Sequence, residues 1–201
     1  MPSTPSFPLA AALAVAAVLA LPVGARAQAP SVPDAIKDKV AICAGCHGAT
    51  GNNDNPQYPV LAGQTARYIY TELRDFKEGR RKHPDMDPIA QALTREEMLA
   101  LGDYFSKQKQ ASSTFKADPA KVALGKKKSD EVLCPMCHLG GFTGQNEIPR
   151  VAGQHYEYVK KQLSDFKARR RTNDAGNMTS VASTLSDEDI ENLAQYATSL
   201  Y

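Results

Sequence analysis

Apolar residues recur at helical spacing in several segments of the chain, and no long segment alternates as a β-strand does. Two segments near the middle and the end place their apolar residues on one helix face. These residues are Met98, Leu101 and Phe105, and then Ile190, Leu193 and Ala197. Both segments open with a capping box, a Thr or Ser followed three residues later by an acidic residue. The pattern predicts helices over about 94–107 and 186–200.

Four further segments are expected to be helical. Two of them, over about 33–42 and 119–132, begin with a proline, which suits the first turn of a helix because its missing N–H has no partner there. Each leads into a cysteine motif. The other two cover about 65–78 and 156–168 and have apolar residues at helical spacing. The chain is therefore predicted to be all-α.

The sequence repeats itself with an offset of about ninety residues. Each copy contains, in the same order, a C-x-x-C-H motif, a Pro-x-x-Ala-Gly-Gln segment, a Leu-x-Asp-Phe-Lys segment and a basic cluster. The matched segments are 43–47 and 134–138, 59–64 and 149–154, 73–77 and 163–167, and 80–82 and 169–171. Chance does not supply so many ordered matches, so the chain is a duplicated domain.

The repeat predicts two tandem domains, 28–110 and 119–201. A linker over 111–118 joins them, within the polar stretch from Gln108 to Asp118. Each domain has only about eighty residues and long loops rich in Gly and Pro, and cores of that size usually need reinforcement. A bulky apolar group is therefore expected at the centre of each domain.

Composition narrows the class of protein. Of the 201 residues, 42% are hydrophobic and 23% are charged, the balance of a folded protein rather than a disordered one. Lys and Arg number 24 against 22 Asp and Glu, so the net charge is only +2. A nucleic-acid binder normally carries a marked basic excess, so that class is excluded.

The N-terminus has the pattern of an export signal. Leu9 to Leu21 is an unbroken apolar run, too short to span a bilayer, and Ala25-Arg26-Ala27 is a small-x-small cleavage site. Cleavage after Ala27 is expected to leave a mature chain that begins at Gln28. The stretch before the apolar run has no Lys or Arg, so an uncleaved membrane anchor is the alternative.

In an exported protein, two C-x-x-C-H motifs indicate covalent attachment of two haem c groups. The thiols of Cys43 and Cys46, and of Cys134 and Cys137, lie three positions apart and can each form a thioether to one haem. The next residue, a histidine, can then bind the iron. Structural disulfides are one alternative, but they do not explain the adjacent histidine or its recurrence at matched positions. A zinc site is the other, but two Cys and one motif His leave each domain one ligand short of a closed tetrahedral site.

His47 and His138 are therefore the candidate iron ligands on one side of each haem. On the other side the candidates are Met86 and Met178, which lie 39 and 40 residues beyond the motif histidines, at equivalent places in the repeat. His83 competes with Met86 but has no counterpart near Met178.

Each repeat also places a proline, Pro59 or Pro149, between the motif and the next helix. Its carbonyl group could accept a hydrogen bond from the Nδ1–H of His47 or His138, which would fix the ring and raise its basicity. A simple turn before a helix is the alternative reading of these prolines.

These motifs, together with the segment from Arg171 to Asp174 before Met178, give the chain a resemblance to the dihaem cytochromes c4, of the class I cytochrome c superfamily. The resemblance covers nearly the whole chain after the leader. It implies a fold of two cytochrome c domains joined face to face, axial pairs His47/Met86 and His138/Met178, and a periplasmic electron carrier.

The resemblance also implies redox proteins as partners. These are a quinol-oxidising complex or a dehydrogenase upstream and a haem-copper terminal oxidase downstream, with peripheral membrane association left open. The alternative function is that of a cytochrome subunit of a larger oxidoreductase, such as a flavocytochrome sulfide dehydrogenase. An enzyme in its own right, such as a dihaem peroxidase, is disfavoured because both halves supply a Met to close the iron site.

The basic clusters at 80–82 and 169–171 are predicted to be solvated helix ends, because cations favour a helix C-terminus. The alternative is that they neutralise haem propionates at the domain contact or form a docking patch.

Overall fold

The computed structural model describes residues 1–3 and 31–200. The predicted apolar run, the cleavage site after Ala27 and the new N-terminus at Gln28 lie outside the described residues. In the described part the regular elements are helices, without a β-strand, and one isolated bridge pairs Gln145 with Ile148. No helix of that part is long and apolar enough to cross a membrane.

The two halves have the same sequence of long helices. In the N-terminal half the elements are η1 (Asp34–Ile36), α1 (Lys37–His47), α2 (Ala66–Lys77), α3 (Met86–Gln91) and α4 (Arg95–Ser106). In the C-terminal half they are α5 (Pro119–Glu131), α6 (Cys134–His138), η2 (Gly140–Phe142), α7 (Tyr156–Lys167), α8 (Asn177–Ser183) and α9 (Asp187–Ser199). The all-α, tandem architecture predicted from the repeat is confirmed.

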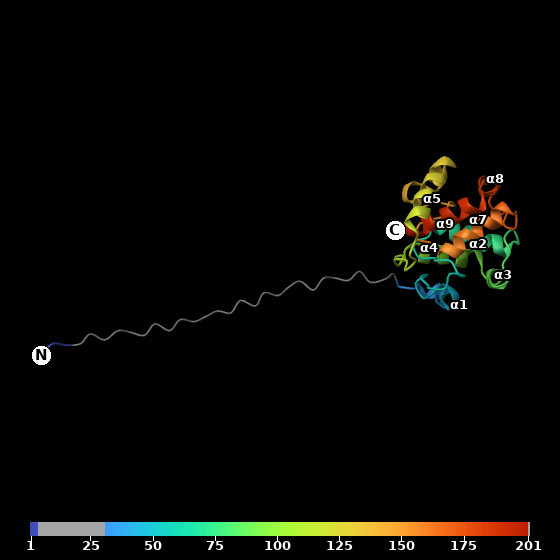
Figure 1. The fold of residues 1–201 in the computed structure, drawn as a ribbon. Helices are drawn as coiled ribbons and strands as arrows, with labels where there is room; N and C mark the ends of the chain where they lie inside the picture. The colour runs from blue at the N-terminus through green and yellow to red at the C-terminus, as the bar shows by residue number, and fades with distance from the viewer. Residues whose placement is uncertain (4–30, 201) are drawn as a thin grey trace.

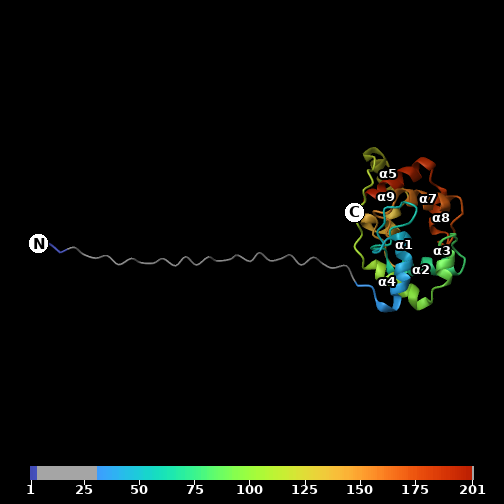
Figure 2. The same ribbon diagram turned by 90° about the horizontal axis from the view of Figure 1, so that it is seen from below.

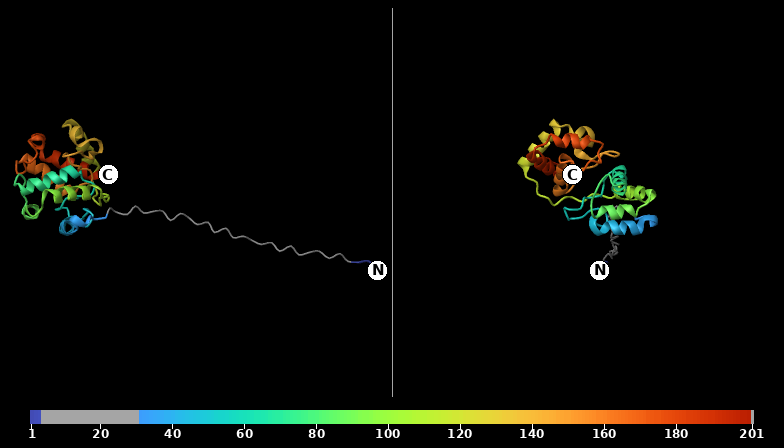
Figure 3. Two further views of the ribbon diagram at one scale, coloured as in Figure 1. Left: turned by 180° about the vertical axis from the view of Figure 1, so that it is seen from behind. Right: turned by 90° about the vertical axis from the view of Figure 1, so that its right-hand side faces the viewer.

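Corresponding helices make corresponding contacts. In the N-terminal half α2 packs against α4 and α3, and in the C-terminal half α7 packs against α9 and α8. The right-hand view of Figure 3 shows the two halves as two bodies, one coloured blue to green and the other yellow to red. Figures 1 and 2 show α2 in the N-terminal half and α7 in the C-terminal half. Side-chain hydrogen bonds bring both helices to the contact between the halves, from Arg171 to Tyr68 and Glu72 of α2 and from Arg81 to Tyr158 and Gln162 of α7.

The predicted caps fix where the long helices begin. Thr94 and Ser186 each accept a hydrogen bond from the backbone N–H three residues on, and the side chain of that residue, Glu97 or Asp189, accepts one in return. Thr65 caps α2 by accepting from the N–H of Tyr68 at 3.2 Å. Each cap satisfies N–H groups that a helix start leaves without partners. The four helices α2, α4, α7 and α9 therefore lie within a residue or two of their predicted positions.

The apolar cores are small. The N-terminal core forms around Ile36, Leu101 and Phe105, and Met98 is buried in it as its place on the helix face predicts. In the C-terminal half the buried apolar residues form two separate clusters, one around Val159 and the other around Ile190. Domains with so little apolar packing of their own usually depend on an added group.

The helices that lead into the cysteine motifs differ between the halves, and the prediction for the first was wrong at both ends. The segment predicted over 33–42 begins as a 3-10 turn, and α1 continues through the whole motif to His47. In the second half Leu133 has a φ of 62° and separates α5 from α6. Pro135, where the first motif has Ala44, cannot donate to a carbonyl four residues earlier and its ring clashes with that carbonyl, so one continuous helix is disfavoured.

The polar stretch from Gln108 to Asp118 packs on the C-terminal half as well as joining the two halves. The Nε2 group of Gln110 donates to the carbonyl oxygens of Ala152 and Gly153 at 3.2 and 2.9 Å. Phe115 stacks on Tyr156 with ring centroids 5.0 Å apart. The stretch from 108 to 118 has no regular secondary structure, as its polar composition predicts.

Candidate haem sites

Helix α1 places the first motif on its last turns, with Cys43, Cys46 and His47 close together. The helix must end at this point because Gly48 has a φ of 80°, and a Cβ there would lie 1.8 Å from the carbonyl oxygen of Asn52. His47 is therefore the last helical residue, and the chain turns away immediately after it.

The short helix α6 presents Cys134, Cys137 and His138 in the same order. All four cysteines have free thiols, so the structure does not support the disulfide alternative. Each motif is left with two thiols and a histidine.

The motif histidines are buried and oriented in the same way. His47 is 7% exposed and His138 is 8% exposed. The Nδ1 atom of His47 lies 2.9 Å from the carbonyl oxygen of Pro59, and that of His138 lies 2.9 Å from the carbonyl oxygen of Pro149. The hydrogen bonds expected as one reading of the two prolines are therefore present.

These contacts determine which ring nitrogen can bind a metal. A carbonyl oxygen only accepts, so Nδ1 carries the proton and Nε2 has a free lone pair. Burial lowers the pKa of both histidines, which favours the neutral ring. A neutral imidazole whose second nitrogen donates to a carbonyl is the usual form of a metal-bound histidine.

The thiols and histidines fit haem better than zinc. Burial raises the pKa of the Cys43 thiol to about 11 and that of the Cys134 thiol to about 11, which disfavours the thiolate that zinc requires. In the residues that the structure describes, His, Cys, Asp and Glu side chains form no group of three able to hold a metal ion. Two thiols and one free Nε2 in each half match the attachment and axial groups of one haem c.

The candidate methionines open corresponding short helices. Met86 is the first residue of α3 and packs against the N-terminal core, and Met178 is the second residue of α8 and is half-buried. The rival His83 has a side chain that is 39% exposed, and its Nδ1 accepts from the N–H of Asp85 at 3.3 Å. The proximity of His83 contributes to the lowered pKa of His47.

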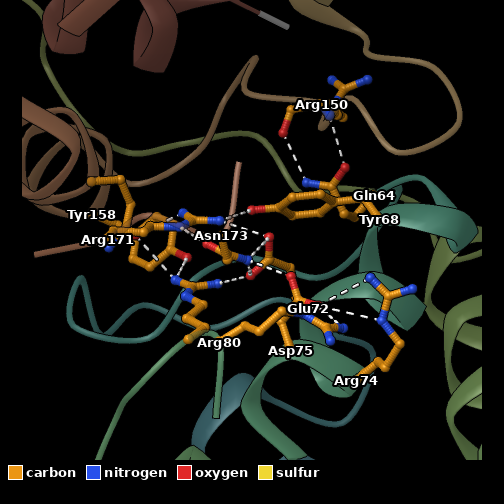
Figure 4. Close-up of polar contacts among 12 residues, drawn as sticks. Gln64, Tyr68, Glu72, Arg74, Asp75, Arg80, Arg150, Tyr158, Arg171 and Asn173 are labelled. Carbon is orange, nitrogen blue, oxygen red and sulfur yellow. Dashed lines mark hydrogen bonds and ion pairs between the residues drawn. The ribbon is translucent and has the colours of Figure 1, made fainter. Parts of the chain in front are cut away.

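A buried ionic cluster joins the two domains at α2 and α7 (Figure 4). The two carboxylate oxygens of Glu72 accept from Arg81 at 2.6 Å and from Arg171 at 2.7 Å. The side-chain oxygen of Gln162 accepts from the same two arginines, at 3.1 and 2.8 Å. Arg81 and Arg171 also donate to the tyrosine hydroxyl of the opposite domain, Tyr158 and Tyr68 respectively.

The prediction of solvated helix ends was therefore wrong for Arg81 and Arg171. The chain turns back after α2 and after α7, which carries the last arginine of each cluster into the domain contact. There Glu72 and Gln162 occupy matched places in the repeat, so one carboxylate serves two arginines. Arg80 keeps a partly exposed position and pairs with Asp75 at 2.7 Å.

Sequence reasoning missed Glu72 and Gln162. The signal was available, because each lies four residues after a matched tyrosine, on the same helix face as Tyr68 or Tyr158. What the linear sequence lacks is the partner, since Arg171 lies 99 residues from Glu72.

Comparison with known proteins agrees with this geometry. Residues 39–109 match the family model described as Cytochrome c. A cytochrome c4 of Stutzerimonas stutzeri is 36% identical over 207 residues, covering 93% of this chain and 98% of the relative. A thiosulfate dehydrogenase electron acceptor of Thiomonas intermedia is 32% identical and covers 94% of this chain and 90% of that protein.

The fold is also similar to that of a solved relative. The crystal structure of reduced recombinant cytochrome c4 from Pseudomonas stutzeri matches with a TM-score of 0.78 and 36% identity, covering 84% of this chain and 98% of that one. The structural similarity covers both halves, in agreement with the duplicated motifs and the paired histidines. The chain therefore belongs to the cytochrome c4 family, the dihaem c-type electron carriers.

Proposed function

We propose that this protein passes single electrons between redox proteins of a respiratory chain in the periplasm. Cys43 and Cys46 attach one haem c and Cys134 and Cys137 the other. The domains that hold the two haems span 28–110 and 119–201, with 111–118 between them, after removal of a signal peptide of residues 1–27.

The observation that carries the proposal is the matched pair of buried histidines. Each has Nδ1 fixed by a proline carbonyl at 2.9 Å, so each presents Nε2 in one orientation. A ring held in this way needs no reorientation when the charge on the metal changes, which favours rapid electron transfer. The haem iron supplies the one-electron chemistry when bound.

Met86 and Met178 are the proposed axial ligands opposite His47 and His138. A thioether is a neutral, soft ligand that favours the ferrous state and raises the potential. Bound by one histidine and one methionine, the iron would keep no open position for a substrate. This supports a carrier that is not itself an enzyme.

The proposed partners are redox proteins, with a quinol-oxidising complex or a dehydrogenase as donor and a haem-copper oxidase as acceptor. A net charge of +2 gives little long-range steering, so docking relies on local patches. A second candidate function is a cytochrome subunit of a larger oxidoreductase, supported by the relative named as a thiosulfate dehydrogenase electron acceptor.

The intact mass of the exported protein tests the attachment sites and the leader together. We expect a chain that begins at Gln28 and carries two haems, and a Cys43→Ala/Cys46→Ala variant that carries one. Two haems remaining in that variant, or a wild-type mass that corresponds to free thiols, would refute the attachment.

Purification of the protein from its source organism distinguishes the two functions. A subunit of a larger oxidoreductase co-purifies with a second polypeptide, whereas a carrier purifies without one.

A further inference from the structure

Two matched glutamines reach across the domain contact. Gln64 and Gln154 end the repeated Pro-x-x-Ala-Gly-Gln segments, and each is 6% exposed. The Oε1 atom of Gln154 accepts from the N–H of Val60 at 2.8 Å, and its Nε2 donates to the carbonyl oxygen of Val60 at 2.9 Å. Gln64 makes the equivalent pair of hydrogen bonds with Arg150: its Oε1 accepts from the N–H at 2.7 Å and its Nε2 donates to the carbonyl oxygen at 2.8 Å (Figure 4).

Each glutamine amide is held in one orientation. Besides the N–H of the opposite domain, each Oε1 atom accepts a hydrogen bond from the backbone N–H of the residue that follows the glutamine. This donor is Thr65 for Gln64, at 2.9 Å, and His155 for Gln154, at 3.0 Å. A flipped amide would point its NH2 group at two N–H donors. Both glutamines are therefore fixed clamps on a single residue of the opposite domain.

The clamped residues adjoin the iron ligands. Val60 follows Pro59, so the carbonyl that accepts from His47 and the N–H that donates to Gln154 belong to the same peptide group. That group is planar, so holding its N–H also holds its carbonyl. In the other domain the peptide group between Pro149 and Arg150 joins His138 to Gln64 in the same way.

The result is a crossed connection. The hydrogen-bond chain from His47 ends on a side chain of the C-terminal domain, and the chain from His138 ends on a side chain of the N-terminal domain. Successive hydrogen bonds polarise one another, so donation to the glutamine oxygen makes the proline carbonyl a better acceptor. A better acceptor makes the histidine more basic, which stabilises ferric iron.

We propose that Gln154 and Gln64 are positioning residues, each of which sets the potential of the haem in the opposite domain. Docking of the domains then fixes both potentials, and separation of the domains releases both. This inference rests on the proposed axial roles of His47 and His138.

The test uses the full-length dihaem protein with Gln154→Leu, which keeps the side-chain bulk and removes both hydrogen bonds to Val60 together with the one from the N–H of His155. A redox titration followed by NMR assigns a potential to each haem from its own methyl signals. We expect the potential of the haem at Cys43 and Cys46 to rise and that of the other haem to move less. The Gln64→Leu variant should show the reverse pattern.

Gln162→Leu is the matched control, because it removes an amide from the same contact without touching either proline peptide. Hydrogen exchange supplies a second readout, in which the N–H of Val60 exchanges faster in Gln154→Leu than in Gln162→Leu. A shift in the haem of the substituted domain, an equal shift in the control, or no shift at all would overturn the proposal.

Failure of the clamp can be distinguished from failure of the proposed function. The number of haems and the low-spin spectra of the unsubstituted protein report the axial ligands alone. If those are as proposed and the crossed pattern is missing, only the role of the two glutamines is lost.

Discussion

At the scale of single residues, the proposed function depends on four proposed iron ligands, His47, Met86, His138 and Met178. His83 has no counterpart in the sequence near Met178, so replacement of Met178 gives the clearer result. Met178→His should lower the potential of that haem while keeping six ligands, because imidazole is a stronger donor than a thioether. Met178→Ala should instead open the iron to carbon monoxide. Redox titration and carbon monoxide binding check both outcomes, and an unchanged potential in both variants would remove Met178 as the ligand.

Met86 faces a competitor three residues away. In Met86→Ala we expect the thioether-to-iron charge-transfer band of the N-terminal haem to disappear, because no other soft ligand replaces the sulfur. Absorption spectra and carbon monoxide binding then show which group, if any, occupies the iron position in the variant. A band that persists shows that Met86 was never the ligand. If the band is lost but the iron stays six-coordinate, His83 has taken the place, and adding His83→Ala should open the site.

Several residue roles follow from the sequence and others do not. The contacts of His47 and His138 with the proline carbonyls were one of two readings of the sequence, in which the motif and the proline recur together, and the structure favours that reading. The buried positions of Arg81 and Arg171 were not expected, because a basic cluster after a helix has the pattern of a solvated end. Glu72 lies in the same domain as Arg81, but its bond to Arg171 forms only where the two domains meet.

At the scale of elements, an ionic cluster ties the helices of the C-terminal domain together. Glu191 on α9 accepts from Lys160 of α7 at 2.7 Å and from Lys121 of α5 at 2.9 Å, and it also bonds the hydroxyl of Tyr156. The hydrogen bonds from Lys160, Tyr156 and Lys121 lower the pKa of Glu191. One carboxylate therefore joins three helices.

We predict that Glu191→Gln lowers the free energy of unfolding at neutral pH by about 1 kcal/mol, a modest value because solvent screens partly exposed pairs. A pKa lowered by folding means that the stabilisation is present above the unfolded pKa, about 4.3, and is lost as the pH falls through the folded pKa. The difference between variant and wild type should therefore shrink in acid. Denaturant unfolding at several pH values measures it.

Glu147→Gln is the control, because Glu147 is exposed and forms no ion pair in the described part of the chain. It should leave the unfolding free energy nearly unchanged at every pH. A Glu191→Gln effect that stays constant from neutral pH to acid would show that the carboxylate charge is not what stabilises the helices.

The long helices could be predicted because each has an apolar face and a cap. Helices α3 and α8 could not, since they have 6 and 7 residues and no side-chain cap. Helices so short are marginal on their own and form through packing, here against α2 and α7. The break before α6 was also missed, although Pro135 inside the motif signals it.

At the scale of the whole molecule, the duplication predicted two domains and a linker, but not how the domains meet. That arrangement depends on bonds between residues far apart in sequence, such as Gln154 with Val60, which no local pattern contains. The structure accordingly predicts that the domains depend on each other.

Separately expressed halves should therefore bind each other and differ in redox titration from the intact protein. The reason is that separation exposes the ionic cluster and frees both glutamine clamps. Analytical ultracentrifugation of the mixed halves and titration of each half measure this. If the halves do not bind each other and their separate titrations together reproduce that of the intact protein, the contact between the domains has no redox role.

The proposed function requires that the chain carries two electrons on two haems, each with one histidine and one methionine ligand. An anaerobic optical redox titration of the full-length protein tests this requirement. We expect uptake of two electrons per chain in one-electron steps, with low-spin spectra throughout and a thioether-to-iron band from both ferric haems. Uptake of a single electron, or a high-spin iron in either domain, would contradict it.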